Sequence, residues 1–455
     1  MGKGTKSNGS VIKEVSSYIS KGSEAELPAE VITKAKQHIL DALAATVSGS
    51  NLKAGQLAIK LIKNQGGTEE AQVAASQVVT SAINAAFANG MMAHADETDD
   101  SHTKTRVHPG SSVVPAALAM SEREGADGES FLKSVVVGYD VGCRIIQALD
   151  KNSLLQGSGA TPSIGGCFGA ASASAAVSRM DEDMVGYVLS YAAQQASGVD
   201  FWKRDKEHIE KAFVFGGMPA RNGVAAAIMV QAGFTGVRDP LSGEDNFFSV
   251  FSTKPSPQLL TQGLGNEYEI MFTDLKQFSV GFPIQAPLYA LLKLMKKYGF
   301  TSQDVKSIVA RLPAYHTVND RDMPDVNLQY ILAVTLLDGN LTFETAHSFE
   351  RMHDPDVLEV KRRITLVQDP ELAAAQYTRH GIVEVITKDG AQLREHAVTR
   401  GTVENPMTTE ETEKKCRELL TPVLGEDRSE ALIDKIWNVE QVGNMRELRP
   451  LLSAL

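Results

Sequence analysis

Helices built from small side chains are the feature of this sequence that most restricts its fold. From Val11 to about residue 200, apolar residues recur at three- and four-residue steps, as at Ile32, Ala35 and Ile39, which is the pattern of an amphipathic helix. Alanine on a buried helix face lets neighbouring helices approach closely, so we expect a tightly packed helical core. The small-residue segments that we expect to form helices are 78–92, 112–124, 166–179, 184–198, 218–231 and 284–297.

The sequence changes character after about residue 275. Residues 305–311 alternate apolar and polar side chains as a half-buried strand does, and residues 363–367 and 381–387 also have the character of strands. The Asp389-Gly390 pair favours a tight hairpin turn, which would lead into a further strand through His396. We therefore expect a small sheet in this part of the chain.

Helical stretches lie between and after these strands, which indicates an inserted domain. They are expected at 328–337, 342–349, 410–424 and 430–439. The sequence thus predicts a mainly α fold, in which both chain ends form a large all-helical domain and a smaller α+β lid domain is inserted. We place the helical domain at residues 1–275 and 405–455, and the lid domain at residues 276–404.

Charge and composition exclude several functional classes. The 45 lysine and arginine residues against 56 aspartate and glutamate residues give a net charge of −11, so the chain lacks the positive charge that holds a nucleic acid backbone. No stretch of the sequence approaches the about 18–20 consecutive apolar residues of a membrane span, and the polar first ten residues predict no secretory signal. The three cysteines are scattered without CxxC spacing, which predicts neither a disulfide framework nor a zinc site and fits a cytoplasmic protein.

The densest polar cluster spans residues 94–110, between two alanine-rich helices. Carboxyl and imidazole groups beside an apolar core favour the shifted pKa values that acid–base catalysis needs. Three interpretations stay open: an acid–base site without metal, a metal site, and a solvated acidic loop. The histidine spacings match no common metal-binding template, so we favour the metal-free site. The candidate metal ligands are His94, Asp96, Asp100, His102 and His108.

A second cluster, residues 201–221, gathers basic side chains, among them Lys211 and Arg221. It predicts either ordinary surface lysines or an edge that binds the carboxylate of a substrate. The glycine-rich segment 157–166 lacks the features of a P-loop or of a dinucleotide-binding turn, and no Gly-x-Ser-x-Gly motif occurs. We therefore expect neither nucleotide binding nor covalent hydrolase chemistry.

Together these segments resemble the MmgE/PrpD family, which includes dehydratases, decarboxylases and epimerases of small carboxylates. The most specific part of the resemblance is the run from Asn89 through Asp99-Asp100 to His108-Pro109. In chain order, the other matching segments are Ala35–Leu43, Val137–Ile145, Lys211 with Gly216 and Gly223, Phe282-Pro283, Asn327–Tyr330, Leu336–Gly339 and Arg351–Pro355. The resemblance implies a homodimer with a cofactor-free active site between the helical domain and the lid.

The resemblance also implies the residues of the site. Asp96 and His108 match the family's aspartate and histidine and are candidates for base and acid, while Lys211 would pair with a substrate carboxylate or stabilise an enolate. One extra residue separates Lys211 from Gly223 relative to the family pattern. The residues that would bind substrate are Ser101, Tyr315 and Gln285.

Three positions depart from the family pattern. Where dehydratases and decarboxylases of the family carry a histidine just before the Pro-Ser step, this sequence has Ala160, and where they carry a lysine and a later histidine it has Val280 and Gln285. We expect a carbon-acid enzyme that removes a proton next to a carboxylate of a small di- or tricarboxylate. A dehydratase-type lyase is favoured, with an epimerase or a catalytically altered binding protein as alternatives.

Overall fold

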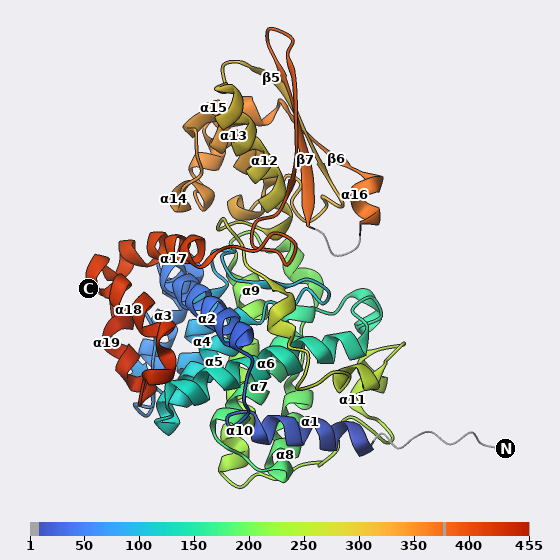
Figure 1. Ribbon diagram of the computed structural model, residues 1–455, viewed down its shortest axis with the longest axis vertical. Coiled ribbons are helices and arrows are strands. Elements are labelled where there is room, and N and C mark those ends of the chain that lie inside the picture. The colour runs from blue at the N-terminus through green and yellow to red at the C-terminus, as the bar shows by residue number, and fades with distance from the viewer. Residues whose placement is uncertain (1–8, 376–378, 455) are drawn as a thin grey trace, which may run out of the picture.

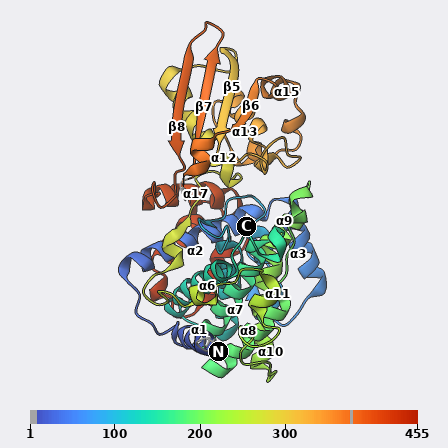
Figure 2. The same ribbon diagram turned by 90° about the vertical axis from the view of Figure 1, so that its right-hand side faces the viewer.

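The computed structural model describes residues 9–375 and 379–454 and has a helical body with a smaller lid above it (Figure 1). The helices α1 and α8 lie at the end of the body farthest from the lid, and α17 lies where the lid meets the body (Figures 1 and 2). The helices of the body are α1 (Gly9–Lys21), α2 (Ala29–Gly49), α3 (Lys53–Gln65), α4 (Ala82–Ala93), α5 (Gly110–Glu124), α6 (Gly128–Leu149), α7 (Thr161–Val177), α8 (Glu182–Gln195), α9 (Ile209–Ala212), α10 (Met218–Gln231), α11 (Phe247–Phe251), α17 (Thr409–Leu424), α18 (Glu426–Trp437) and α19 (Arg449–Leu452).

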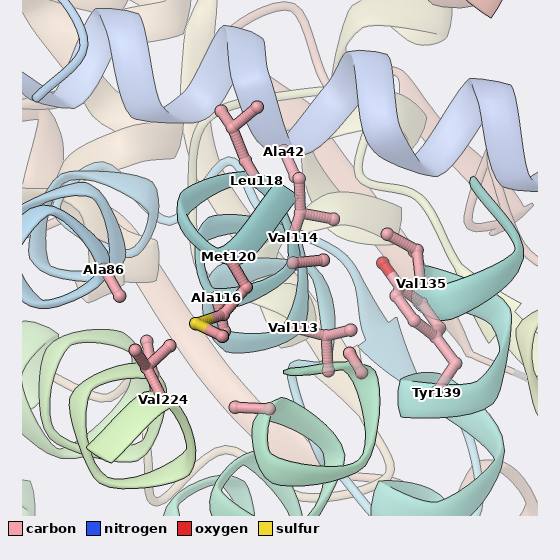
Figure 3. Close-up of a cluster of buried hydrophobic side chains, with 14 of the residues drawn as sticks. Ala42, Ala86, Val113, Val114, Ala116, Leu118, Met120, Val135, Tyr139 and Val224 are labelled. Atoms are coloured by element: carbon pink, nitrogen blue, oxygen red, sulfur yellow. The ribbon is translucent and has the colours of Figure 1, made fainter. Parts of the chain in front are cut away.

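Helix α5 is the centre of the body, because nearly all of its side chains are buried. It packs against α2, α4, α6, α7 and α10, and Figure 3 shows Val113, Val114 and Leu118 of α5 among side chains from the surrounding helices. The alanines and serines of α5 and α7 keep these helices close together, as the sequence predicts. A Val or Leu side chain that leaves water contributes about 1.5–3 kcal/mol, so this contact region is a main source of stability.

A very close helix contact lies between α4 and the π-helical turn Phe213–Gly217, which joins α9 to α10. A Cβ atom on Gly216 would lie 2.0 Å from the carbonyl oxygen of Gly90 in α4, so only glycine fits. This approach brings the π-helical turn against the end of α4, where the polar loop 94–109 begins.

The lid is built on a four-stranded sheet with the order β6-β5-β7-β8. Strand β5 pairs in parallel with β6 and antiparallel with β7, and β7 and β8 form the predicted hairpin. The helices α12 and α13 pack against the sheet and close a separate hydrophobic core. The lid elements are α12 (Phe282–Tyr298), β5 (Val305–Leu312), α13 (Leu328–Asp338), α14 (Phe343–Ala346), α15 (Pro355–Lys361), β6 (Ile364–Gln368), α16 (Pro370–Ala374), β7 (His380–Thr387) and β8 (Gln392–Val398).

The mainly α fold class with a small α+β part is confirmed, with one difference. The body is not purely helical, because it contains two short two-stranded ladders. Their strands are β1 (Ala71–Gln72) with β2 (Val79–Thr80), and β3 (Ser101–His102) with β4 (Thr273–Asp274). Two-residue strands carry no alternating pattern, so periodicity could not predict them. The ladder β3–β4 fixes the polar loop 94–109 to the segment that leads into the lid.

One continuous helix of the described chain, Ile209–Gln231, is long and apolar enough to cross a membrane. However, 67% of its most apolar stretch is buried inside the body. Core helices pass the same test of length and composition, so this helix is only weak evidence for a membrane span.

Replacing Gly216 with Ala tests the close contact between α4 and the π-helical turn. Because the new Cβ would meet backbone rather than a movable side chain, we expect the free energy of unfolding to fall by about 1–3 kcal/mol, as overpacking does. Urea denaturation measures the change. The matched control is Gly443→Ala, whose Cβ would have its nearest neighbour at 3.8 Å; equal stability of the two variants would contradict the close contact.

Candidate active site

Asp100 holds the polar loop 94–109, which joins α4 to α5, against the helical core. This buried carboxylate accepts hydrogen bonds from His38 Nδ1 and Tyr139 Oη, both at 2.6 Å, and from the backbone N–H of Gly110 at 2.9 Å. These donors come from α2, α6 and α5. Asp100 therefore anchors the loop to three core helices, and its two oxygens are already bound to those donors.

Asp99 joins two histidines and a lysine. Its Oδ2 lies 2.9 Å from His94 Nδ1 and 3.1 Å from His108 Nδ1, and its Oδ1 lies 3.3 Å from Lys276 Nζ. An ionised carboxylate accepts, so each imidazole donates its Nδ1–H and presents Nε2 on the other side of the ring. Asp99 thus fixes both the orientation and the tautomer of His108.

Glu97 binds the two lysines of the site. Its side chain forms an ion pair with Lys211, and its Oε2 lies 3.2 Å from Lys276 Nζ, which also donates to the Glu97 backbone carbonyl at 2.8 Å. The Nε2 atoms of His94 and His208 both lie 3.6 Å from Glu97 Oε1. The Glu97 carboxylate therefore lies at a position that two lysines and two imidazoles surround.

Two residues of this cluster have left-handed backbone conformations. Glu97 has φ +55° and His208 has φ +59°, values that non-glycine residues adopt at a cost. Backbone strain of this kind concentrates at functional sites, where the surrounding structure enforces it. Here the strained conformations direct both side chains to the same point.

Helix α9 and the π-helical turn that follows it place Lys211 and Phe215 beside the loop. The Phe215 ring stacks on the His94 ring with centroids 4.3 Å apart, and Lys211 Nζ lies 5.4 Å from the Phe215 centroid. A π-helical turn closes its backbone hydrogen bonds over one residue more than an α-helical turn. Such turns are rare and are frequent at functional sites.

The lid reaches the site through two side chains. Asp325 Oδ2 lies 2.7 Å from His208 Nδ1, and His347 Nε2 lies 3.0 Å from the backbone carbonyl of Asp96. Both lid residues thus contact the body at the polar cluster. The candidate active site lies where the body and the lid meet.

Burial and charge shift the pKa values of this cluster in different directions. Burial lowers the pKa of His94 and of His108, although Asp99 opposes both shifts. Burial alone would raise the pKa of Asp99, but the two histidines and Lys276 hold it well below its usual range. His108 is therefore a neutral imidazole near pH 7, and Asp99 is an ionised partner for it.

Lys211 and His208 differ from these two histidines. Burial lowers the pKa of Lys211 to about 7, so this lysine can give up a proton near neutral pH. For His208, burial is outweighed by the Asp325 carboxylate, which raises the pKa of the imidazole. The site thus contains two imidazoles with a lowered pKa, His94 and His108, and one with a raised pKa, His208.

Two groups of three side chains have ligand atoms within 4.8 Å of one another, as a metal ion requires. They are His94 with Asp99 and His108, and His94 with Glu97 and His208. Lys276 contacts both carboxylates and Lys211 contacts Glu97, so a divalent cation would face two ammonium groups at close range. The charges favour an anionic ligand over a cation.

Some of the residues predicted to form the site lie in the cluster around Glu97 and Asp99, and others lie outside it. His108 and Lys211 lie in the cluster, whereas the Asp96 side chain accepts from Ser48 Oγ at 2.6 Å and from the Thr98 backbone N–H at 2.9 Å. Ser101 accepts from the lid residue Arg379 at 3.1 Å. Asp96 therefore supports the loop, and Ser101 lies at a contact between the loop and the lid.

The other two predicted binding residues lie in the lid. Gln285 is buried and bonds the backbone of Phe278 and Val280, so its amide shapes the start of α12. Tyr315 packs against the lid core beside His316. Among the basic residues 201–221, Lys211 reaches the cluster, while Lys203 and Lys206 pair with Asp200 and Asp322.

Sequence reasoning missed Glu97, Asp99, Lys276, His208 and Asp325 as a connected group. Val280 stands where the family pattern has a lysine, but Lys276 is fully buried four residues before it and contacts both site carboxylates. Lys276 is the one charged residue between Leu275 and Val280, which was a signal that could have identified it. Glu97 gave no such signal, because the backbone turn that directs it is not visible in residue types.

Residues 13–260 match the MmgE/PrpD N-terminal domain, and residues 278–441 match the MmgE/PrpD C-terminal domain. The chain belongs to the MmgE/PrpD family.

Similar proteins have identities of 21–25%. The cis-aconitate decarboxylase-like protein oryM of Aspergillus oryzae is 22% identical over 98% of each chain. The cis-aconitate decarboxylase of Aspergillus terreus is 21% identical over 97% of this chain and 96% of its own. The cis-aconitate decarboxylase of Mus musculus is 25% identical over 81% of this chain and 78% of its own.

The low pKa of buried His94 predicts a pH-dependent stability. An unfolded chain takes up a proton at this histidine below about pH 6.5, whereas the folded chain does not, so the free energy of unfolding should fall as the pH drops below that value. His208, whose pKa is raised, has the opposite effect, because the folded chain binds a proton at this histidine more tightly than the unfolded chain does. We expect His94→Gln to reduce the loss of stability between about pH 6.5 and 5.

Urea denaturation of the two proteins at several pH values measures this effect. The exposed histidine His353 offers the matched variant His353→Gln, which should keep the wild-type slope. An unchanged slope for His94→Gln would contradict the buried, neutral state of His94.

Proposed function

We propose that this MmgE/PrpD enzyme is a lyase that removes a proton from the carbon next to a carboxylate of a small di- or tricarboxylate. The observation that carries the proposal is the Asp99–His108 pair beside two buried lysines. Proton abstraction from such a carbon needs a neutral base near pH 7 and positive charge where the enolate develops. Side chains of this chain supply both, so the proposed reaction needs no cofactor.

His108 is the proposed base. Asp99 holds its Nδ1–H, its pKa is lowered by burial, and its side chain is 11% exposed whereas that of His94 is fully buried. A neutral imidazole with one nitrogen fixed by a carboxylate can accept a proton on the other nitrogen. His108 therefore meets the chemical requirements of a base better than His94 does.

Lys211 and Lys276 are the proposed binding groups for the substrate carboxylate and for the enolate. In this structure both lysines bind the carboxylate of Glu97, so their ammonium groups are placed where a carboxylate fits. A lysine whose pKa lies at about 7 can also exchange a proton during turnover. We propose that Glu97, rather than its neighbour Asp96, is the acidic residue that works with these lysines.

Elimination of water is the favoured outcome. The named relatives make cis-aconitate the first compound to test, and a dehydratase would act on it in the reverse direction, by adding water. Epimerisation is the second candidate, since it requires a base and an acid on opposite faces of a carbon. The presence of a second imidazole in the cluster, His208, besides His108 favours this alternative: their ring centroids lie 5.5 Å and 5.1 Å from that of His94.

We further propose a homodimeric, cytoplasmic enzyme. The family resemblance supports the dimer, and the unpaired buried cysteines support a reducing compartment. Light scattering of the purified chain would test the dimer: a monomeric mass at micromolar concentration would contradict it.

Replacing His108 with Ala should abolish proton abstraction. We expect turnover to fall by about two to four orders of magnitude, as loss of a general base does. The measurement is NMR in deuterated water with cis-aconitate, citrate and malate as probes. Deuterium at carbon reports proton abstraction, new olefinic signals report dehydration, and deuterium without net conversion reports epimerisation.

The matched control is His353→Ala, which removes an exposed imidazole of the lid and should keep the wild-type rate. Wild-type protein that neither exchanges nor converts any probe would overturn the proposed function. An unchanged rate for His108→Ala would overturn the assignment of the base.

A further inference from the structure

His208 and Asp325 form a buried pair that crosses from the body to the lid. His208 lies directly before α9, and Asp325 lies in the short turn Pro324–Val326 that precedes α13. The distance from His208 Nδ1 to Asp325 Oδ2 is 2.7 Å, and both side chains are nearly fully buried. Charge-assisted hydrogen bonds of this length are among the stronger ones in proteins.

The second nitrogen of His208 points into the site. Within the described residues, His208 Nε2 is buried and has no hydrogen-bond partner, although Glu97 Oε1 lies 3.6 Å away. His347, the other histidine between the lid and the loop, bonds through both of its nitrogens. An unpaired buried polar atom costs stability. The Nε2 atoms of three other histidines, His38, His94 and His102, are also buried without a partner. His208 differs from these three because a carboxylate of the lid binds its Nδ1.

The backbone of His208 points to the same conclusion. Its φ of +59° and ψ of +21° are costly for a histidine, and the strain is kept although glycine or asparagine would relieve it. The His208 ring also lies against His94, with ring centroids 5.5 Å apart, so the pair is part of the cluster that contains the Asp99–His108 pair.

We infer that His208 is a second proton-transferring residue of this site, and that Asp325 of the lid positions it. This inference rests on the proposed function. In dehydration, His108 takes the proton from carbon, the carbon–oxygen bond breaks, and the Nε2 proton of His208 passes to the leaving oxygen to form water. In epimerisation, the same proton passes to carbon on the face opposite His108. Afterwards His108 loses a proton to solvent and His208 gains one.

Asp325 makes this proton transfer depend on the lid. Its side chain bonds His208, and its backbone carbonyl accepts from the Gly281 N–H at 2.8 Å, so the turn that carries Asp325 is tied to the start of α12. Movement of the lid away from the body would separate the carboxylate from the imidazole. His208 would then lose the contact that raises its pKa.

Replacing His208 with Asn separates proton return from proton abstraction. Asparagine tolerates the left-handed backbone, and its amide N–H can still reach Asp325, while nothing replaces Nε2. With whichever probe the wild type converts, we expect net conversion to fall at least about 100-fold while deuterium exchange by His108 changes less than about threefold. His108→Ala should lose both.

Asp325→Asn tests the positioning role. The charged or titratable groups that face His208 are Asp325 of the lid, Glu97, Asp96 and His94 of the loop region, and Asp205 and Lys211 of its own segment. With the Asp325 charge removed, His208 should lose its proton at lower pH, so the basic limb of the kcat profile should shift to lower pH. ¹⁵N-imidazole NMR of the full-length protein should show the same shift without substrate.

The matched control is Asp322→Asn, an exposed lid carboxylate 3.5 Å from Lys206 of the body. It should leave the kcat profile and the NMR titration unchanged. Full net conversion by His208→Asn would overturn the donor role while the proposed function stands, and an unshifted His208 titration in Asp325→Asn would overturn the positioning role. Absence of exchange and conversion with every probe in wild-type protein would instead overturn the proposed function, and the donor role with it.

Discussion

The site depends on the burial of two carboxylates, Glu97 and Asp99, in the interior of the protein. An ionised carboxylate without partners is too costly to bury, so it must be paired or protonated. Lys276 contacts both of them, and Lys211 contacts Glu97. Loss of one partner of such a pair costs about 3–5 kcal/mol, because it leaves an uncompensated buried charge. Removal of any one of these charged groups would therefore destabilise the others.

Further contacts from several parts of the chain hold the polar loop 94–109 in its strained conformation. Lys415 of α17 donates to the Thr98 carbonyl at 3.1 Å, and Thr98 Oγ1 donates to Ser279 at 2.6 Å. His347 of the lid holds the Asp96 carbonyl from another side. Because residues from the C-terminal helices, the lid and its connecting segment all bind this short stretch, the left-handed conformation of Glu97 is enforced by contacts on every side.

The fold was largely predictable from the sequence because its signals are periodic. Helices such as α5 and α10 and the β7–β8 hairpin follow from apolar spacing and turn residues. The geometry of the site was less predictable. The residue pattern placed the polar loop correctly between two helices, but no periodicity fixes side-chain directions in a loop. Whether Asp96 or its neighbour Glu97 faces the lysines depends on one backbone angle, and residue types alone do not determine it.

The residues that depart from the family pattern acquire a different meaning in the structure. Ala160, Val280 and Gln285 suggested a site short of ionisable groups, and hence a simpler reaction or a less charged substrate. Lys276 supplies a positive charge close to Val280 in the sequence, and His208 supplies an imidazole from a different segment than Ala160. The number of ionisable groups therefore does not argue for simpler chemistry. The imidazole of His208 belongs to the same segment of the body as Lys211, and a lid carboxylate holds it. The charge at the site therefore depends on the position of the lid.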